Sequence, residues 1–579
     1  MEIGFNIAVI LLILLITYWW ANQGFLSSLL HLLAVVLAGA VAIGFWELVA
    51  NLMIRGGGFD QYAWGTALIG MFAICLVVFR IASDRLVPNN VGIPRVADLV
   101  GGGICGLGSG TITTGILLLG CGFIYSHSEI MGYRGYGRAE RTGEVQSARL
   151  NALWVPAEEF TAKFYSLLSG GALYPDFSRT PLYQYSPDLH KQAYLVRDTF
   201  SDGKGALAMP KDAADVKNLY WQPDDSTVGV MVEFNERASD FADQLALSSS
   251  QVRLIGWAKG RSTAPVVHPS GWMQDIKGSR ANPLPFDEFT FDSSTNYATS
   301  ITGRNESLIM FKFRVPSGFQ PRFIQIRNAR YDMPEAEELP PAGLIGRFAS
   351  TSLSRNSELD PRVAEALESI ISMPEGEEKD RALREYVAGI KAATAVDIVF
   401  GGSIDQAVEV TNSTRPVRIN LNDLSSMDEN DRQLTKGFGV FPKRHNGRIS
   451  KQLLIDTFYE PPDTRMVMVD ISQRSVANLF IDRLYQNEAI SEKAHVHLID
   501  TDGNEYFPVG YFYEKPDKNE IKLEPGKKLG RRADFPRVPT RGDFKLRLMF
   551  YIPTETNLVR FDWDDVTVGK MQVYVGPQE

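Results

Sequence analysis

Four long apolar segments in the first 125 residues constrain this chain more than any other feature of its sequence. They cover residues 3–20, 25–54, 62–81 and 96–125. A helix needs ~20 mostly apolar residues to cross a bilayer core of about 30 Å, and each segment meets or approaches that length. The first has no basic residue before it and continues through a short polar turn into the second, unlike a cleaved signal peptide. The sequence therefore predicts a four-helix transmembrane domain over residues 1–125.

Charge and cysteine usage exclude two classes of function for the remainder of the chain. The whole chain carries a formal net charge of −9. After residue 125 acidic and basic residues are evenly mixed, without the basic cluster that nucleic acid requires. The three cysteines, Cys75, Cys105 and Cys121, all fall in apolar segments. We therefore expect no nucleic-acid partner, and no disulfide or thiolate metal site in the soluble region.

The fourth apolar segment contains a ladder of small residues. Gly102, Gly106 and Gly110 recur every four residues, so they share one face of a helix. Small residues at this spacing let two helices approach closely inside lipid, and we predict that this face packs on another helix. A phosphate-binding glycine loop would need a preceding strand in a βαβ unit, which the apolar surroundings do not offer.

Three polar side chains, His31, Glu47 and Asp98, fall within the apolar segments. Polar groups are costly in lipid and often mark function, so the three form a candidate intramembrane polar site. The competing interpretation is that they reach water, because Glu47 and Asp98 lie near predicted helix ends and His31 lies near the start of its helix.

The membrane region resembles the colicin V production protein (CvpA) family. The resemblance rests on residues 79–86, which include Arg80 and Arg85, and on residues 94–107, a Pro-Arg-Val-Ala-Asp opening followed by glycines. Ser109-Gly110 stands where the family usually has Arg-Gly. The resemblance implies a membrane domain linked to toxin production and envelope integrity, which in some members anchors an extracytoplasmic protease.

The next part of the chain is predicted to be a collar at the membrane surface, over residues 126–200. It is rich in arginine, tyrosine and proline. Pro156 and Gly170 bracket a short amphipathic pattern, which predicts a helix over about 157–168.

Two later stretches read as copies of one β unit. Residues 251–256 and 495–500 share an alternating pattern, and each is followed by a glycine and then Pro-Val at the same spacing. Short alternating strands separated by Gly and Pro predict immunoglobulin-like β-sandwich domains, at 201–340 and 461–579. Leu254 and Leu498 should then be buried at equivalent positions. Further on, residues 313–316 are matched with residues 550–553, each a short segment that begins with Phe and ends with Pro.

An α/β bridging segment is predicted between the two β domains, over residues 341–460. Apolar residues at helical spacing and the position of Asp360-Pro361 predict helices over 360–372 and 377–393. The overall fold class is thus a four-helix transmembrane domain followed by a mixed α+β region dominated by two β-sandwiches.

No catalytic motif is recognisable in the soluble region, and we predict no enzyme, no cofactor and no metal. A serine protease triad, an H-E-x-x-H motif and a C-x-x-C motif are all missing from the sequence. His495 and His497 could share a strand face and hold a metal, but a third ligand is lacking. Asp500 opens a calcium-like loop whose twelfth position is Tyr511 rather than Glu, so we interpret it as a hairpin turn.

The most consistent function is that of a multi-pass protein of the bacterial inner membrane, presenting β domains for binding or scaffolding. Its expected partners are the lipid bilayer, other envelope proteins and, as a hypothesis, further copies of itself. Two alternatives are an oligomeric channel or transporter accessory subunit, and an anchored hydrolase with an unfamiliar site.

The side of the membrane on which the soluble region lies is predicted from arginines in short loops. Arg80, Arg85 and Arg95 flank the connection between the third and fourth segments, which favours the cytoplasm for that connection. Arg55 and the arginines just after the fourth segment argue the opposite. Because some CvpA family members anchor an extracytoplasmic protease, we predict that the soluble region lies outside the cytoplasm.

Overall fold

A computed structural model describes most of the chain between residues 2 and 577. The parts that it leaves undescribed are 57–59, 88–93, 125–128, 147, 152, 171–179, 201–204, 223–225, 241–242, 259–263, 275–286, 303–305, 339–401 (apart from Ser369, Met373 and Arg381), 415–417, 445–452, 480–493, 502, 540–542 and 565. Apart from Ser369 and Arg381, both helices predicted in the bridging segment lie outside the described residues.

The first 122 residues form a bundle of four helices. These are α1 (Glu2–Ala21), α2 (Phe25–Gly56), α3 (Ala63–Leu86) and α4 (Arg95–Gly122). Each is long and apolar enough to cross a membrane, as the sequence predicted. Helix α4 contacts the other three, and its apolar stretch is more buried inside the protein than those of the other three helices. Exposed apolar side chains line α1 along its whole length, from Ile3 to Trp19, as expected for a surface in contact with lipid.

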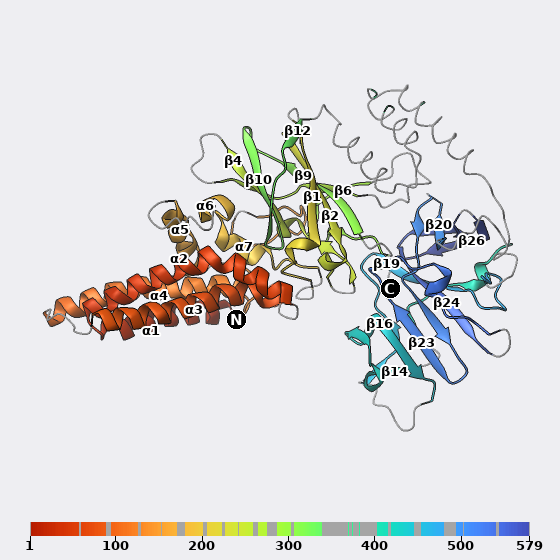
Figure 1. The fold of residues 1–579 in the computed structure, drawn as a ribbon, viewed down its shortest axis with the longest axis horizontal. Helices are drawn as coiled ribbons and strands as arrows, with labels where there is room; N and C mark the ends of the chain where they lie inside the picture. The colour runs from red at the N-terminus through yellow and green to blue at the C-terminus, as the bar shows by residue number, and fades with distance from the viewer. Residues whose placement is uncertain are drawn as a thin grey trace.

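A set of short helices follows the bundle, within the residues 126–200 that the sequence assigned to a collar. It contains α5 (Ala157–Ser169), α6 (Leu182–Tyr185) and α7 (Leu189–Leu195). Figure 1 shows these helices along one side of the bundle, with the β-rich part of the chain beyond them. Collar residues such as Tyr133, Tyr165 and Tyr194 share one hydrophobic core with the bundle. The collar is therefore packed on the bundle and is not a free linker.

The first β region contains two sheets that contribute to one core. The six-stranded sheet has the order β12 (Ala336–Glu338), β1 (Ala214–Gln222), β2 (Thr227–Asn235), β9 (Glu306–Arg314), β6 (Gly271–Gln274), β7 (Asp287–Thr290). The four-stranded sheet has the order β11 (Ala329–Asp332), β10 (Phe319–Ile326), β4 (Val252–Ala258), β5 (Val266–Val267). Val230 and Phe311 from the first sheet and Leu254 and Ile324 from the second belong to the same cluster.

The second β region repeats this arrangement. Its larger sheet has the order β13 (Val408–Val410), β19 (Thr464–Asp470), β24 (Lys545–Pro553), β22 (Gly510–Glu514), β23 (Lys518–Leu523), β16 (Gln433–Pro442), β15 (Met427–Asn430), with β18 (Thr457–Phe458) beside β16. Its smaller sheet has the order β21 (Glu505–Tyr506), β20 (Val496–Asp500), β25 (Thr556–Trp563), β26 (Val566–Val575). Two small pairs complete the described strands, β3 (Ala246–Leu247) with β8 (Ala298–Thr299), and β14 (Ile419–Asn420) with β17 (Leu454–Ile455).

The two regions have corresponding strands in the same spatial order. Strands β5-β4-β10-β11 correspond to β21-β20-β25-β26, and β1-β2-β9-β6-β7 correspond to β13-β19-β24-β22-β23. Leu254 on β4 and Leu498 on β20 are both fully buried, which confirms the prediction made for them. The immunoglobulin-like type of the two domains stays a prediction.

The register of the strands corrects one detail of the sequence alignment. Val230 lies opposite Phe311, and its counterpart Val467 lies opposite Phe550. Phe550 therefore corresponds to Phe311 and not to Phe313. The reason is that Pro316 lies two residues beyond the end of β9, whereas Pro553 is the last residue of β24. Matching these two prolines therefore places β24 two residues out of step.

The larger sheet of the second region also begins earlier than residue 461, where the sequence placed the start of the domain. Strand β13 pairs with β19, and β16 pairs with β23, although both precede that residue. Patterning alone could not assign these strands, because the partners that complete their hydrogen bonds lie many residues later.

Candidate functional site

The glycine ladder of α4 lies against α1. A Cβ atom added at Gly106 would lie 2.9 Å from the Thr17 carbonyl oxygen, and one added at Gly110 would lie 2.9 Å from the Ile13 carbonyl oxygen. At Gly102 the nearest atom, also a backbone carbonyl of α1, would be 3.2 Å away. Because these neighbours are backbone atoms, they cannot move aside as a side chain could. The ladder therefore sets the distance between the two helices.

Two of the three predicted polar residues lie at the end of the bundle far from the β regions. Asp98 accepts a hydrogen bond of 2.5 Å from the backbone N–H of Phe25, at the start of α2, where a carboxylate satisfies an otherwise free donor. The His31 ring stacks on Trp20, with centroids 3.8 Å apart. The guanidinium of Arg80 lies 4.9 Å from the Trp20 ring centroid. We call these four side chains, Trp20, His31, Arg80 and Asp98, the distal cluster; its contacts connect all four helices.

Glu47, the third of these residues, lies apart from the distal cluster. It forms an ion pair of 3.0 Å with Arg330 of β11, which precedes the undescribed part of the bridging segment. The same guanidinium lies 4.7 Å from the ring centroid of Tyr185 and 5.1 Å from that of Phe323. The structure therefore does not bring the three polar residues into one site, and Glu47 instead joins α2 to the first β region.

Arg197 makes a second connection, which the sequence did not reveal. Its guanidinium donates to the carbonyl oxygens of Cys121 (3.2 Å), Gly122 (3.2 Å) and Ile124 (3.1 Å) at the end of α4. A cation is favourable at this position because the last carbonyls of a helix are unsatisfied and carry partial negative charge. The side chain is 1% exposed. No local pattern predicts this contact, since the partners are more than 70 residues apart.

Buried ion pairs continue from the collar into the first β region. Arg138 pairs with Asp198 at 2.6 Å and also donates to the Ser294 carbonyl oxygen at 2.6 Å. Arg253 of β4 pairs with Asp188 at 2.6 Å. Burial alone would raise the pKa of Asp188, but the surrounding positive charges, Arg253 first, lower it overall.

The start of α5 carries a further buried pair. Arg149 contacts Glu158 at 2.9 Å and Glu159 at 2.7 Å. Burial raises the pKa of Glu158, and the charge of Arg149 offsets only part of that effect. Four arginines thus hold the bundle, the collar and the first β region together. We call this set, Arg138, Arg149, Arg197 and Arg330, the joint.

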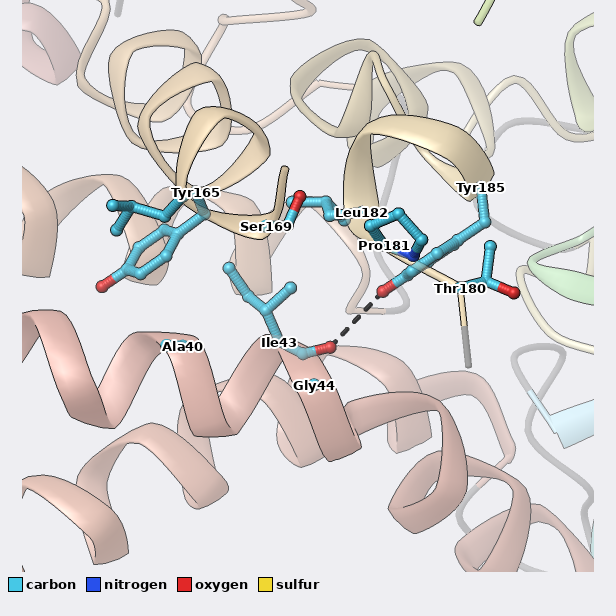
Figure 2. A pocket seen from close by; sticks show the side chains of 10 residues that line it. Ala40, Ile43, Gly44, Tyr165, Ser169, Thr180, Pro181, Leu182 and Tyr185 are labelled. Atoms are coloured by element: carbon cyan, nitrogen blue, oxygen red, sulfur yellow. Dashed lines mark hydrogen bonds between the residues drawn. The ribbon is translucent and has the colours of Figure 1, made fainter. Parts of the chain in front are cut away.

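Two tyrosines attach the collar helices to α2 beside a small, mainly apolar pocket, which Figure 2 shows together with the hydrogen bond of Tyr185. The hydroxyl of Tyr185 lies 3.4 Å from the Ile43 carbonyl oxygen. The hydroxyl of Tyr165 lies 3.2 Å from the carbonyl oxygen of Val35 and 3.3 Å from that of Val36. Both hydroxyls donate to helix carbonyls, so the pocket between α2 and the collar is bounded by fixed contacts.

The alternatives for metal binding gain no support from the residues that the structure describes. Among them, no group of three or more His, Cys, Asp and Glu side chains is placed to hold a metal ion. The Asp500 carboxylate accepts hydrogen bonds from the backbone and side chain of Asn504 and from the Tyr506 hydroxyl. These are internal contacts of a hairpin turn, in which Gly503 has φ of +84°. They fit the interpretation of this sequence as a turn.

Fold and geometry together define a class of protein: a four-helix bundle of membrane-spanning length, joined through a buried arginine-rich collar to a β-rich region. No family model, no curated protein and no solved structure matches the chain. These comparisons therefore identify no family for the chain, and the CvpA resemblance stays a prediction from the sequence.

Proposed function

We propose that this chain is a scaffold of the bacterial inner membrane, whose helical bundle anchors and orients β-rich regions that bind other envelope proteins. The observation that carries the proposal is the joint. A linker between an anchor and a free domain is usually exposed and polar, whereas here collar, bundle and first β region share one hydrophobic core. The ion pair of Glu47 with Arg330 and the contacts of Arg197 with the end of α4 add polar connections to that core. Such an attachment fixes the orientation of the β region relative to the membrane.

The second β region offers the surface that we assign to protein binding. Phe438 and Val440 of β16 are 44% and 40% exposed. They lie opposite Lys522 and Glu520 of β23, so an apolar pair is bordered by both signs of charge. Exposed aromatic side chains with a polar rim are typical of protein interfaces. Lys436, on the same strand, pairs with Asp243 of the first β region at 2.8 Å, which supports a connected extramembrane body.

The experiment uses the full chain in its native membrane, with a photoreactive amino acid at single positions. Phe438 and Val440 test the proposed surface, and exposed Lys570 of β26 is the matched control on the same region. Discrete protein adducts at Phe438 and Val440, absent at Lys570, are the expected result. Equal labelling at all three positions, or none, would contradict the scaffold. Adducts to copies of the same chain through lipid-facing Leu14, together with ion flux in liposomes, would favour the channel alternative instead.

The proposal includes an extracytoplasmic location for the β regions. It also includes a role in toxin production or envelope integrity, which the CvpA resemblance implies. The location is supported by Arg80, Arg85 and Arg95, which lie toward the end of the bundle opposite the β regions. Ser226→Cys in a cysteine-free background provides the test. A membrane-impermeant maleimide, admitted through the outer membrane, should label intact cells; labelling only after lysis would place the β regions in the cytoplasm.

A further inference from the structure

Helix α5 lies in a groove of the bundle formed by glycines of two helices. A Cβ atom at Gly115 of α4 would collide with Thr161, and one at Gly39 of α2 would collide with Tyr165. The absence of side chains at these two positions is what lets α5 approach both helices. The Tyr165 hydroxyl, bonded to the Val35 carbonyl oxygen at 3.2 Å, fixes the helix in the groove.

The groove lies within the apolar length of the bundle. Helices α1 and α4 are antiparallel, with Gly110 next to Ile13 and Gly106 next to Thr17. Gly115 is five residues beyond Gly110, which places it level with about Ala8 of α1. At 1.5 Å per residue, this level is roughly 7 Å inside the exposed apolar residue Ile3. Amphipathic helices that lie in a membrane interface are buried to about 5–10 Å, so the depth of α5 fits such a helix.

The outward surface of α5 is divided into an apolar and a polar stripe. Phe160 is 60% and Leu167 is 77% exposed, and half-buried Phe164 lies between them at helical spacing. Beside this stripe, Lys163 and Glu159 form an ion pair of 2.7 Å. A helix packed on a bundle at the membrane surface needs these two stripes, one for acyl chains and one for water and headgroups.

We propose that α5 is an interfacial membrane helix, with Phe160, Phe164 and Leu167 immersed in the acyl chains of the leaflet next to the β regions. Exposed Trp154 (57%) precedes the helix and adds an aromatic side chain of the kind enriched at this depth. The inference rests on the proposed membrane insertion of the bundle, and it adds a fifth helix to the surface that contacts lipid. It also explains why Phe160 and Leu167 of a collar helix are exposed, while half-buried Phe164 between them packs in part against the core.

The test is spin-label accessibility in the full chain, purified and placed in nanodiscs of phosphatidylethanolamine and phosphatidylglycerol. Single cysteines replace Phe160 or Leu167 after the three native cysteines have been removed. Lys163→Cys is the matched control on the polar stripe of the same helix. Leu14→Cys reports insertion of α1, and Lys545→Cys on β24 reports water. Power saturation is then measured with oxygen, which concentrates in lipid, and with a nickel chelate, which stays in water.

The expected result is that labels at Phe160 and Leu167 are relaxed by oxygen as strongly as the label at Leu14, whereas those at Lys163 and Lys545 are relaxed by nickel. Nickel relaxation at Phe160 and Leu167, with oxygen relaxation retained at Leu14, would overturn the inference while leaving the anchor intact. Nickel relaxation at Leu14 as well would instead overturn membrane insertion itself. Low access of both reagents to the apolar stripe would show that a second copy of the chain, and not lipid, covers it.

Discussion

The ion pair between Glu47 and Arg330 gives the sharpest test of the joint. Their side chains are only 20% and 19% exposed, so the pair lies between the exposed pairs that contribute about 0.2–1 kcal/mol and the buried pairs whose disruption costs about 3–5 kcal/mol. We expect Glu47→Gln to destabilise the attachment of β11 by about 1–2 kcal/mol. Arg330→Gln should cost more, about 2–4 kcal/mol, because it also removes contacts with the rings of Tyr185 and Phe323, each worth about 0.5–1 kcal/mol.

Hydrogen exchange of the full chain in nanodiscs measures these costs locally, because it reports the free energy of opening for the β10–β11 peptides. A loss of 1–2 kcal/mol corresponds to about 5- to 30-fold faster exchange. Since the two side chains touch, the double variant should lose less than the sum of the single losses, by about 1 kcal/mol. Glu233→Gln is the control: it breaks a partly exposed pair with Lys217 (2.8 Å) between β1 and β2 and should leave β11 unchanged.

Two results would refute this reasoning. Strictly additive single and double variants would mean that the ion pair makes no contribution of its own. A larger effect of Glu47→Gln than of Arg330→Gln would mean that the aromatic contacts of the arginine do not stabilise the joint.

Three further predictions follow from buried or closely packed positions. Leu254→Ala and Leu498→Ala should each lower the unfolding free energy by roughly 2–5 kcal/mol, measured by hydrogen exchange of the respective β region; a large loss for one and none for the other would contradict their equivalence. Gly106→Leu should separate α4 from α1 and reduce the folded yield from detergent extracts, whereas Gly103→Leu, whose added Cβ has no neighbour closer than 4.0 Å, should be tolerated; equal yields would show that the ladder does not limit packing. Burial outweighs the effect of the nearby carboxylates and lowers the pKa of His190 from 6.5 to about 4. Because the unfolded chain binds this proton more readily than the folded chain does, the free energy of unfolding should fall as pH decreases from about 6.5 to about 4. His190→Gln should reduce this dependence in thermal melts, and an unchanged pH profile would contradict it.

Features that depend on neighbouring residues were predictable from the sequence. The four membrane helices follow from the length of apolar segments, because a helix satisfies its own backbone hydrogen bonds and needs only apolar side chains to lie in lipid. The face of α4 that approaches α1 follows from the spacing of Gly106 and Gly110. The repeated strands follow from alternation and turn residues, and burial of Leu254 and Leu498 follows with them.

Features that depend on which surfaces meet were decided only by the tertiary structure. Glu47 is a polar residue in an apolar segment by sequence, but 283 residues separate it from the arginine that pairs with it. The sequence does not distinguish Arg197 from the other arginines of the collar, and only the fold places the end of α4 beside it. The sequence likewise predicts that residues around 157–168 form an amphipathic helix. The glycines against which α5 packs belong to two other helices, however, and the groove that they form determines which face of α5 is left exposed. Local patterns determine which segments become helices and strands, whereas the partner of a charge and the environment of an exposed apolar face depend on contacts between distant parts of the chain.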